Sequence, residues 1–261
     1  MIASRPPAVA GQFYSDDADV LNRQMRSWLP LQPTTEKGAR RPRGLIVPHA
    51  GYLYSGATAA KAFRHLQGHN YRRIFLLGPP HRVPVEGIAL PHWQQFSTPL
   101  GEVPLDTECI EKLARLGDVR LRNTPHAREH CLEVQLPFLQ WLMPGVPVVP
   151  MLVGDIAPQA LAELLTNFVE EEDLLLISTD LSHFHPLAEA QQRDNATVAK
   201  ILRLEAQIDP NEACGASPLN GALLFARERG YKVSLLAQTT SAEAGGDTER
   251  VVGYAAFALY H

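Results

Sequence analysis

The chain has little cysteine and no long apolar run. Its 261 residues include three cysteines, which stand at positions 109, 131 and 214. An odd number of widely separated cysteines does not form a disulfide framework. No apolar stretch approaches the roughly 20 residues of a membrane span, and the first residues lack the apolar core of a signal peptide. We therefore expect a cytoplasmic protein that does not enter a membrane.

The charge balance and the glycine pattern exclude further classes. The formal net charge of -4 argues against a general nucleic-acid binder, because that role needs a basic face. The sequence contains neither a phosphate-binding glycine loop nor a Gly-x-Ser-x-Gly elbow, so it does not support a nucleotide-binding loop or a serine hydrolase. Hydrophobic residues make up 45% of the chain and charged residues 20%, which is typical of a globular protein with a substantial core.

Apolar strand-like runs alternate with helical patterns along most of the chain. This alternation predicts an α/β fold in which helices flank a largely parallel central sheet on both faces. Absence of internal repeats favours a single domain over residues 1–261. Ser55 and Ser217 are expected to cap two of the helices, and the polar segment 32–43 is expected to be a surface loop. The predicted helices are 20–29, 55–66, 105–116, 130–143, 158–168, 187–204 and 217–229, and the predicted strands begin at 44, 74, 88, 146, 174, 232 and 251.

Three of the strand-like runs are followed by histidines. His49 follows the first run, His81 follows the second, and Asp180 and His183 follow the run that begins at 174. Loops after the carboxyl ends of strands in an open α/β sheet gather in one crevice, where ligands bind. Neutral imidazole is the commonest protein ligand for metals and a general base near neutral pH. The pattern therefore predicts a metal or acid–base site.

The other candidate residues each allow two interpretations. Asp180 can orient an imidazole or cap the helix that follows it. His130 and Glu133 stand three residues apart, so they can share a helix face as a metal or proton-relay pair, or form an ordinary surface pair. Cys214 precedes a helix start, where a thiol has a lowered pKa and is a soft ligand, or it is a small packed residue. His185, before a proline, is interpreted as structural.

Several distinctive segments are spread along nearly the whole chain, and they are Arg5–Tyr14, Pro48–Tyr52, Gly78–His81, Glu129–Glu133, Ser178–His183 and Arg250–Tyr254. In this order they resemble the MEMO family, whose bacterial and archaeal members are also called AmmeMemoRadiSam system protein B. The resemblance implies a single α/β domain similar to class III extradiol dioxygenases, which hold non-haem iron at a sheet edge.

The resemblance also implies a metal site. The ligand positions of the family fall on His49, His81 and Cys214. Fe(II) is the expected ion, and the thiolate, which is softer than the carboxylate of the dioxygenases, also suits copper. Arg82 follows His81 where many members of the family carry a second histidine.

The acid–base position of the family falls on His183, with Asp180 beside it, and His130 and Glu133 match a polar pair that lines the same pocket. Two functions are consistent with this arrangement. One is a metal-dependent redox enzyme similar to a dioxygenase. The other is a non-catalytic module that binds a peptide or small ligand. In that second role, the resemblance implies partners of the AMMECR type and a radical-SAM protein.

Overall fold

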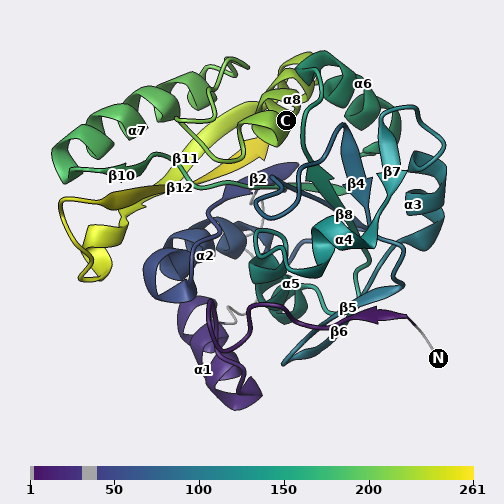
Figure 1. Ribbon diagram of the computed structural model, residues 1–261, viewed down its shortest axis with the longest axis horizontal. Coiled ribbons are helices and arrows are strands. Elements are labelled where there is room, and N and C mark those ends of the chain that lie inside the picture. The colour runs from purple at the N-terminus through teal and green to yellow at the C-terminus, as the bar shows by residue number, and fades with distance from the viewer. Residues whose placement is uncertain (1–2, 31–39) are drawn as a thin grey trace.

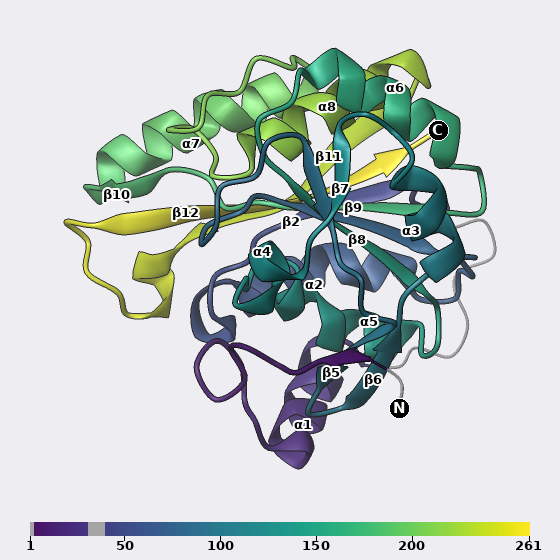
Figure 2. The same ribbon diagram turned by 45° about the vertical axis from the view of Figure 1, so that its right-hand side comes forward.

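The computed structural model describes residues 3–30 and 40–261. A mixed β-sheet runs through the middle of the molecule, and helices cover both of its faces (Figures 1 and 2). Most of the loop predicted at 32–43 lies outside the described residues. Only residues 40–43 are described, and they lead directly into the strand that begins at Gly44.

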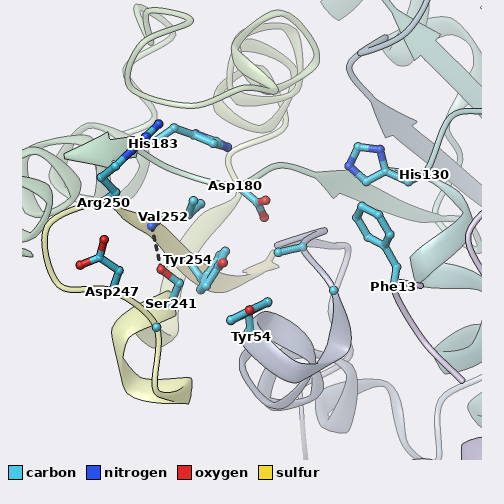
Figure 3. A pocket seen from close by; sticks show the side chains of 13 residues that line it. Phe13, Tyr54, His130, Asp180, His183, Ser241, Asp247, Arg250, Val252 and Tyr254 are labelled. Atoms are coloured by element: carbon cyan, nitrogen blue, oxygen red, sulfur yellow. Dashed lines mark hydrogen bonds between the residues drawn. The ribbon is translucent and has the colours of Figure 1, made fainter. Parts of the chain in front are cut away.

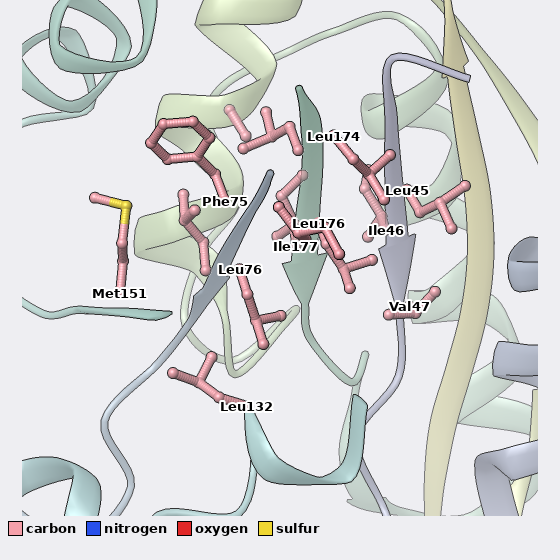
Figure 4. Close-up of a cluster of buried hydrophobic side chains, with 14 of the residues drawn as sticks. Leu45, Ile46, Val47, Phe75, Leu76, Leu132, Met151, Leu174, Leu176 and Ile177 are labelled. Carbon is pink, nitrogen blue, oxygen red and sulfur yellow. The ribbon is translucent and has the colours of Figure 1, made fainter. Parts of the chain in front are cut away.

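Four parallel strands form the centre of the sheet. They lie in the order β2 (Gly44–Val47), β9 (Leu174–Ser178), β3 (Ile74–Gly78) and β8 (Val148–Val153), and all of their residues are buried. Strands that are covered on both faces have nearly continuous apolar sequences, which is why these four strands could be predicted from the sequence. Their leucine, isoleucine and valine side chains make the core shown in Figure 4.

The flanks of the sheet are antiparallel. β12 (Val251–Tyr260) pairs with β2 on one side and carries β10 (His183–His185) and β11 (Lys232–Thr240). On the other side β4 (Ile88–Leu90) is antiparallel to β8 and parallel to β7 (Val119–Leu121). The sheet is therefore mixed: the predicted α/β architecture is present, with parallel strands at the centre of the sheet and antiparallel pairings at its flanks.

A second, small sheet joins β1 (Ser4–Arg5), β5 (Gln95–Thr98) and β6 (Gly101–Pro104). It lies on the same side of the main sheet as α5 in Figure 2. Through β1 it fixes the beginning of the described chain to the body of the molecule.

The helices divide between the two faces of the sheet, as Figure 2 shows. One face carries α6 (Pro158–Phe168), α7 (Leu187–Leu202) and α8 (Ala216–Glu228). The remaining helices are α1 (Ala18–Trp28), α2 (Ala57–Phe63), α3 (Thr107–Leu113), α4 (Asn123–Ala127) and α5 (Leu136–Leu142), with short turns of π-helix at Tyr52–Gly56 and of 3-10 helix at Arg64–Leu66, Glu133–Gln135 and Ser241–Ala244. In residues 3–30 and 40–261 no helix is both long and apolar enough to cross a membrane.

Three local predictions are wrong. Ser55 lies inside the π-helical turn and donates to the Ala50 carbonyl, so it caps no helix. Ser217 lies inside α8, where its hydroxyl donates to the Gly154 carbonyl. The predicted helix 130–143 begins only at the 3-10 turn Glu133–Gln135, so His130 lies in the preceding turn.

Candidate metal centre

Two strand ends and one helix start bring His49, His81 and Cys214 together. His49 follows β2, His81 follows β3, and Cys214 precedes α8. One ligand atom from each of the three lies within 4.8 Å of the others, and His49 Nε2 is 3.2 Å from Cys214 Sγ. The three residues that the sequence placed at a metal site are therefore neighbours in the fold.

A glycine lets α8 begin against the end of β9. The Gly215 N–H donates to Thr179 Oγ1 at 2.9 Å, and a Cβ at this position would lie only 2.7 Å from Thr179 Cβ. The absence of a side chain therefore allows the close approach that holds Cys214 over the sheet edge.

Hydrogen bonds to Ser178 fix the tautomer of His49. The Ser178 hydroxyl donates its single proton to the Cys131 carbonyl at 2.6 Å and accepts from Gln135 Nε2 at 2.9 Å. His49 Nδ1 lies 3.0 Å from the same oxygen, so His49 must supply the proton of that bond. His49 Nε2 is left with its lone pair, directed to Cys214.

Glu129 does the same for His81. Its carboxylate accepts the His81 N–H at 2.6 Å and lies 2.9 Å from His81 Nδ1. Burial of Glu129 works against its charge, but hydrogen bonds from His130 and His81 prevail and hold the pKa of this carboxyl well below its usual range. An ionised carboxylate only accepts, so His81 carries its proton on Nδ1 and has a free Nε2. Metal-binding histidines are oriented by such partners in proteins.

The Cys214 thiol has a raised pKa, contrary to the expectation from its place before a helix. Burial and the nearby Asp180 carboxylate raise it to about 12, and the Asp180 N–H, 3.4 Å from Sγ, only partly offsets them. Burial therefore outweighs the helix start. A coordinated cation would reverse this balance, because a metal deprotonates the thiol that binds it. Two imidazoles and a thiol fit a borderline or soft transition metal.

Asp180 caps no helix. Its Oδ1 accepts the His49 N–H at 2.7 Å, and its Oδ2 lies 4.0 Å from His49 Nε2. Burial raises the pKa of this carboxyl. Asp180 therefore holds the loop that carries His49.

A backbone carbonyl orients His183, where a carboxylate such as that of Asp180 was expected. His183 Nδ1 donates to the Leu181 carbonyl at 2.8 Å. Since a carbonyl only accepts, His183 Nε2 is free to take a proton. The side chain lines the same pocket as Asp180 and His130.

His130 and Glu133 separate in the structure. His130 lines the pocket, and its ring centre is 5.3 Å from that of His49 and 4.6 Å from that of His81. Its buried Nδ1 lies 3.1 Å from Glu129 Oε1 without the alignment of a hydrogen bond, and its backbone N–H donates to the same oxygen at 2.9 Å. The two residues do not share a helix face, because the chain turns between them.

Glu133 is wholly buried and is not among the residues that line the pocket. Its carboxylate accepts hydrogen bonds of 2.7 to 3.0 Å from the Arg5 guanidinium, the Ala8 and Val9 N–H groups and the Tyr14 hydroxyl. The expectation that Glu133 lines the pocket is therefore wrong, since all of these partners belong to the N-terminal segment.

A pocket of about 400 Å³ lies beside the cluster. Figure 3 shows Phe13 and His130 on one side of it, His183 and Arg250 on the other, and Asp180 between them. Tyr54, Tyr254 and Val252 complete much of its wall. The pocket combines aromatic surface with groups that can exchange protons.

Sequence reasoning missed Ser178 and Glu129, which fix the two histidine tautomers. Both residues lie in segments that carry the family resemblance, but the residues next to them in the sequence do not predict the role of either side chain. Glu129 reaches His81 across 48 residues, and Ser178 reaches His49 across 129. The only signal in the sequence is that a polar side chain ends the apolar run of β9.

The fold has a counterpart among solved structures. The crystal structure of the uncharacterized protein JW3007 from Escherichia coli K12 matches with a TM-score of 0.51, covering 82% of this chain and 99% of that one. Sequence identity is 13%, so the likeness shows a shared fold and nothing about activity.

The sequence comparisons are more specific. A family model described as Memo-like protein matches residues 5–258. The MEMO1 family protein of Sulfolobus acidocaldarius is 33% identical, with 96% of this chain and 97% of the relative aligned. That of Aquifex aeolicus is 32% identical with the same coverage, and that of Ignicoccus hospitalis is 34% identical with 97% of each chain aligned. The chain therefore belongs to the Memo-like protein family, as its motifs predicted.

Proposed function

We propose that this Memo-like protein is a metal-dependent redox protein that holds Fe(II), or alternatively copper, between His49, His81 and Cys214. The observation that carries the proposal is the convergence of one ligand atom each from His49, His81 and Cys214 within 4.8 Å. Both imidazoles are oriented from behind, by Ser178 and by Glu129. An accidental group of histidines has no need of two such partners.

Different residues of the chain would bind the metal, orient its ligands and transfer a proton. Bound metal would supply Lewis acidity and a one-electron couple to a ligand in the pocket. Ser178 and Glu129 keep the protons of the two histidines on Nδ1, away from the ligand atoms. His183 accepts a proton from the ligand at its free Nε2, within a pocket whose aromatic wall displaces water.

A second candidate function is a module that binds a partner or ligand without turnover. Exposed apolar side chains favour it, because Leu53, Tyr54 and Phe184 are 72%, 44% and 61% exposed, and such side chains are typical of recognition surfaces. Tyr54 also lines the pocket. In this role the protein would be one component of an AmmeMemoRadiSam-type system, beside AMMECR-type and radical-SAM proteins.

Metal analysis tests the proposed centre. Protein purified without oxygen is titrated with Fe(II) and with Cu(I), and His49→Ala is compared with His92→Ala, which removes an exposed histidine outside the cluster. We expect one ion per chain in the wild type and in His92→Ala, and none held tightly by His49→Ala. Metal bound equally by all three proteins would refute the proposed centre.

The role of His183 has its own test. His183→Gln should retain the metal and lose turnover, measured as oxygen uptake with candidate ligands. Loss of the metal from this variant would make His183 a ligand. Wild-type protein that binds metal and ligands but consumes no oxygen with any of them would favour the binding module.

A further inference from the structure

A second depression reaches the cluster separately from the pocket of Figure 3. It has a volume of about 300 Å³, and the only residue it shares with that pocket is His183. Its wall is made by His81, His183, His185, Pro210, Asn211 and Cys214. Three histidines and a thiol therefore face one small space, and apart from Pro210 the wall is polar.

All three histidines of this wall have their Nδ1 atoms engaged. Nδ1 of His81 contacts the Glu129 carboxylate, and Nδ1 of His183 donates to the Leu181 carbonyl. Nδ1 of His185 lies 3.1 Å from the Glu189 carboxylate on α7. His81 and His183 therefore keep their Nε2 lone pairs for another partner. His49, at the inner end of the cluster, likewise has its Nδ1 bound, to Ser178, and its Nε2 free.

Solvent reaches two histidines of this wall but not His49 behind them. The side chains of His185 and His81 are 27% and 28% exposed, whereas that of His49 is 1% exposed. An ion from solvent can therefore meet His185 or His81 directly, but it can reach His49 only after passing these groups. Glu189, 45% exposed beside His185, is paired with Arg193 at 2.8 Å, so the two side chains together add no net charge at the mouth of the depression.

The outer histidines do not make a strong site of their own. Groups of three potential ligands within 4.8 Å occur at His49, His81 and Cys214 and at His81, Glu129 and His130, and neither group includes His183 or His185. Weak binding is what a transfer path requires, because a tight outer site would retain the ion.

We propose that His185 and His183 form an entry path for the metal, a claim that rests on the proposed function of the inner cluster. A hydrated divalent cation, or Cu(I) released from a carrier, exchanges one of its ligands at a time for Nε2 of His185 and then of His183. It next contacts His81 and Cys214, and the thiol proton leaves to solvent as Sγ binds. His49 completes the ligand set. No electron is transferred in these steps.

The rate of metal uptake tests this path. Metal-free protein is mixed rapidly with Co²⁺, and the absorption band of the cobalt–thiolate bond reports arrival of the ion at Cys214. We expect His185→Ala to slow uptake at least about threefold, with the final band and the affinity unchanged. A path residue alters entry and exit equally, so release to a chelator should slow by the same factor. His92→Ala serves as the matched control and should behave like the wild type.

Three results would count against the path. An uptake rate of His185→Ala equal to that of the wild type would exclude His185 from it, while leaving the inner site intact. A lower affinity or a changed band in His185→Ala would make His185 a ligand of the inner site. Absence of the band from wild-type protein would instead overturn the inner site itself, so the two proposals fail through different measurements.

Discussion

Ser178 decides which nitrogen of His49 carries the proton, because its own proton is committed to the Cys131 carbonyl. Ser178→Ala removes this control and leaves His49 Nδ1 buried without a partner. Loss of such an orienting group typically lowers metal affinity about 10- to 100-fold. Competition titration with a chelator measures the loss, and Ser27→Ala, which removes an exposed hydroxyl of α1, should have no effect. An unchanged affinity would show that His49 needs no orientation by Ser178.

Cys214 is the softest of the three candidate ligands. A thiolate favours Cu(I) more than a hydroxyl does, whereas Fe(II) discriminates less between sulfur and oxygen. We therefore expect Cys214→Ser to weaken Cu(I) binding more than Fe(II) binding. Anaerobic titrations of both ions against wild type and variant measure the two changes. Equal losses for the two ions would remove the softness argument.

His126 links stability to pH. It is 1% exposed, its Nε2 donates to the Ala89 carbonyl, and its Nδ1 is buried without a partner. Burial lowers its pKa to about 3, so between about pH 6.5 and that value the unfolded chain binds a proton that the folded chain excludes. The free energy of unfolding therefore falls as the pH falls through this window, by about 1.4 kcal/mol per pH unit from this residue.

The comparison that isolates this effect uses His126→Gln, whose amide keeps the donor to Ala89 and cannot titrate. Chemical denaturation at several pH values should give a shallower acid dependence for the variant than for the wild type. Parallel pH profiles would show that His126 titrates with its ordinary pKa in the folded protein.

Single residues differ in how far the sequence reveals them. His49 and His81 have ligand chemistry and stand at strand ends, so type and position indicated them, whereas only the family resemblance selected Cys214. The role of Glu133 could not be seen, because its partners are Arg5 and the residues up to Tyr14, more than a hundred positions away. A buried carboxylate and a catalytic one look alike until their partners are known.

Among the elements, the N-terminal segment from Arg5 to Tyr14 has the most distinctive anchor. Arg5 and Glu133 form an ion pair of 2.7 Å with side chains that are 1% and 0% exposed. Arg5 also donates to the His126 and Glu129 carbonyls. The anchor therefore ties β1 to the turn that carries Glu129 and to the wall that Phe13 adds to the pocket.

Breaking this pair from one side leaves a buried charge without a partner. Glu133→Gln should lower the free energy of unfolding by about 3–5 kcal/mol, measured by chemical denaturation. The double variant Arg5→Met with Glu133→Gln should lose less than the sum of the single variants, because their coupling is removed once. Additive losses would show that the pair contributes no interaction of its own. Arg203→Met, at an exposed ion pair, is the control and should change stability little.

Elements also differ in how well the sequence marks them. Residues 158–168 form α6 with the predicted bounds, and β9 and β12 begin at the predicted residues 174 and 251, since each has a clear apolar pattern. The short strands β1, β5, β6, β7 and β10 and the short helix α4 were missed, because each is too short to show a periodic apolar pattern. β1, β7 and β10 in addition pair with strands distant in the sequence. Strand direction is likewise a property of the chain path, which is why the antiparallel flanks were not foreseen.

At the scale of the whole molecule, the cluster joins segments from β2, β3, β9 and α8. An ion that binds only the assembled cluster stabilises the folded state through mass action. At a free concentration one hundred times Kd the gain is about 2.7 kcal/mol, or roughly 5–10 °C in Tm for a domain of this size. Thermal unfolding with and without Fe(II) measures the shift, and His49→Ala should abolish it. The same shift in His49→Ala would place the ion elsewhere.

The position of β12 has a consequence for the order of events during synthesis. β2 lies between β9 and β12 in the sheet, yet β12 leaves the ribosome after every other described element. Until then β2 has an open edge, and such edges recruit other chains. A nascent chain that has already exposed His49 and His81 still lacks Cys214. The proposed centre can therefore take up an ion only after Cys214 has left the ribosome, and a chain stalled before that point has both an open edge on β2 and an incomplete ligand set.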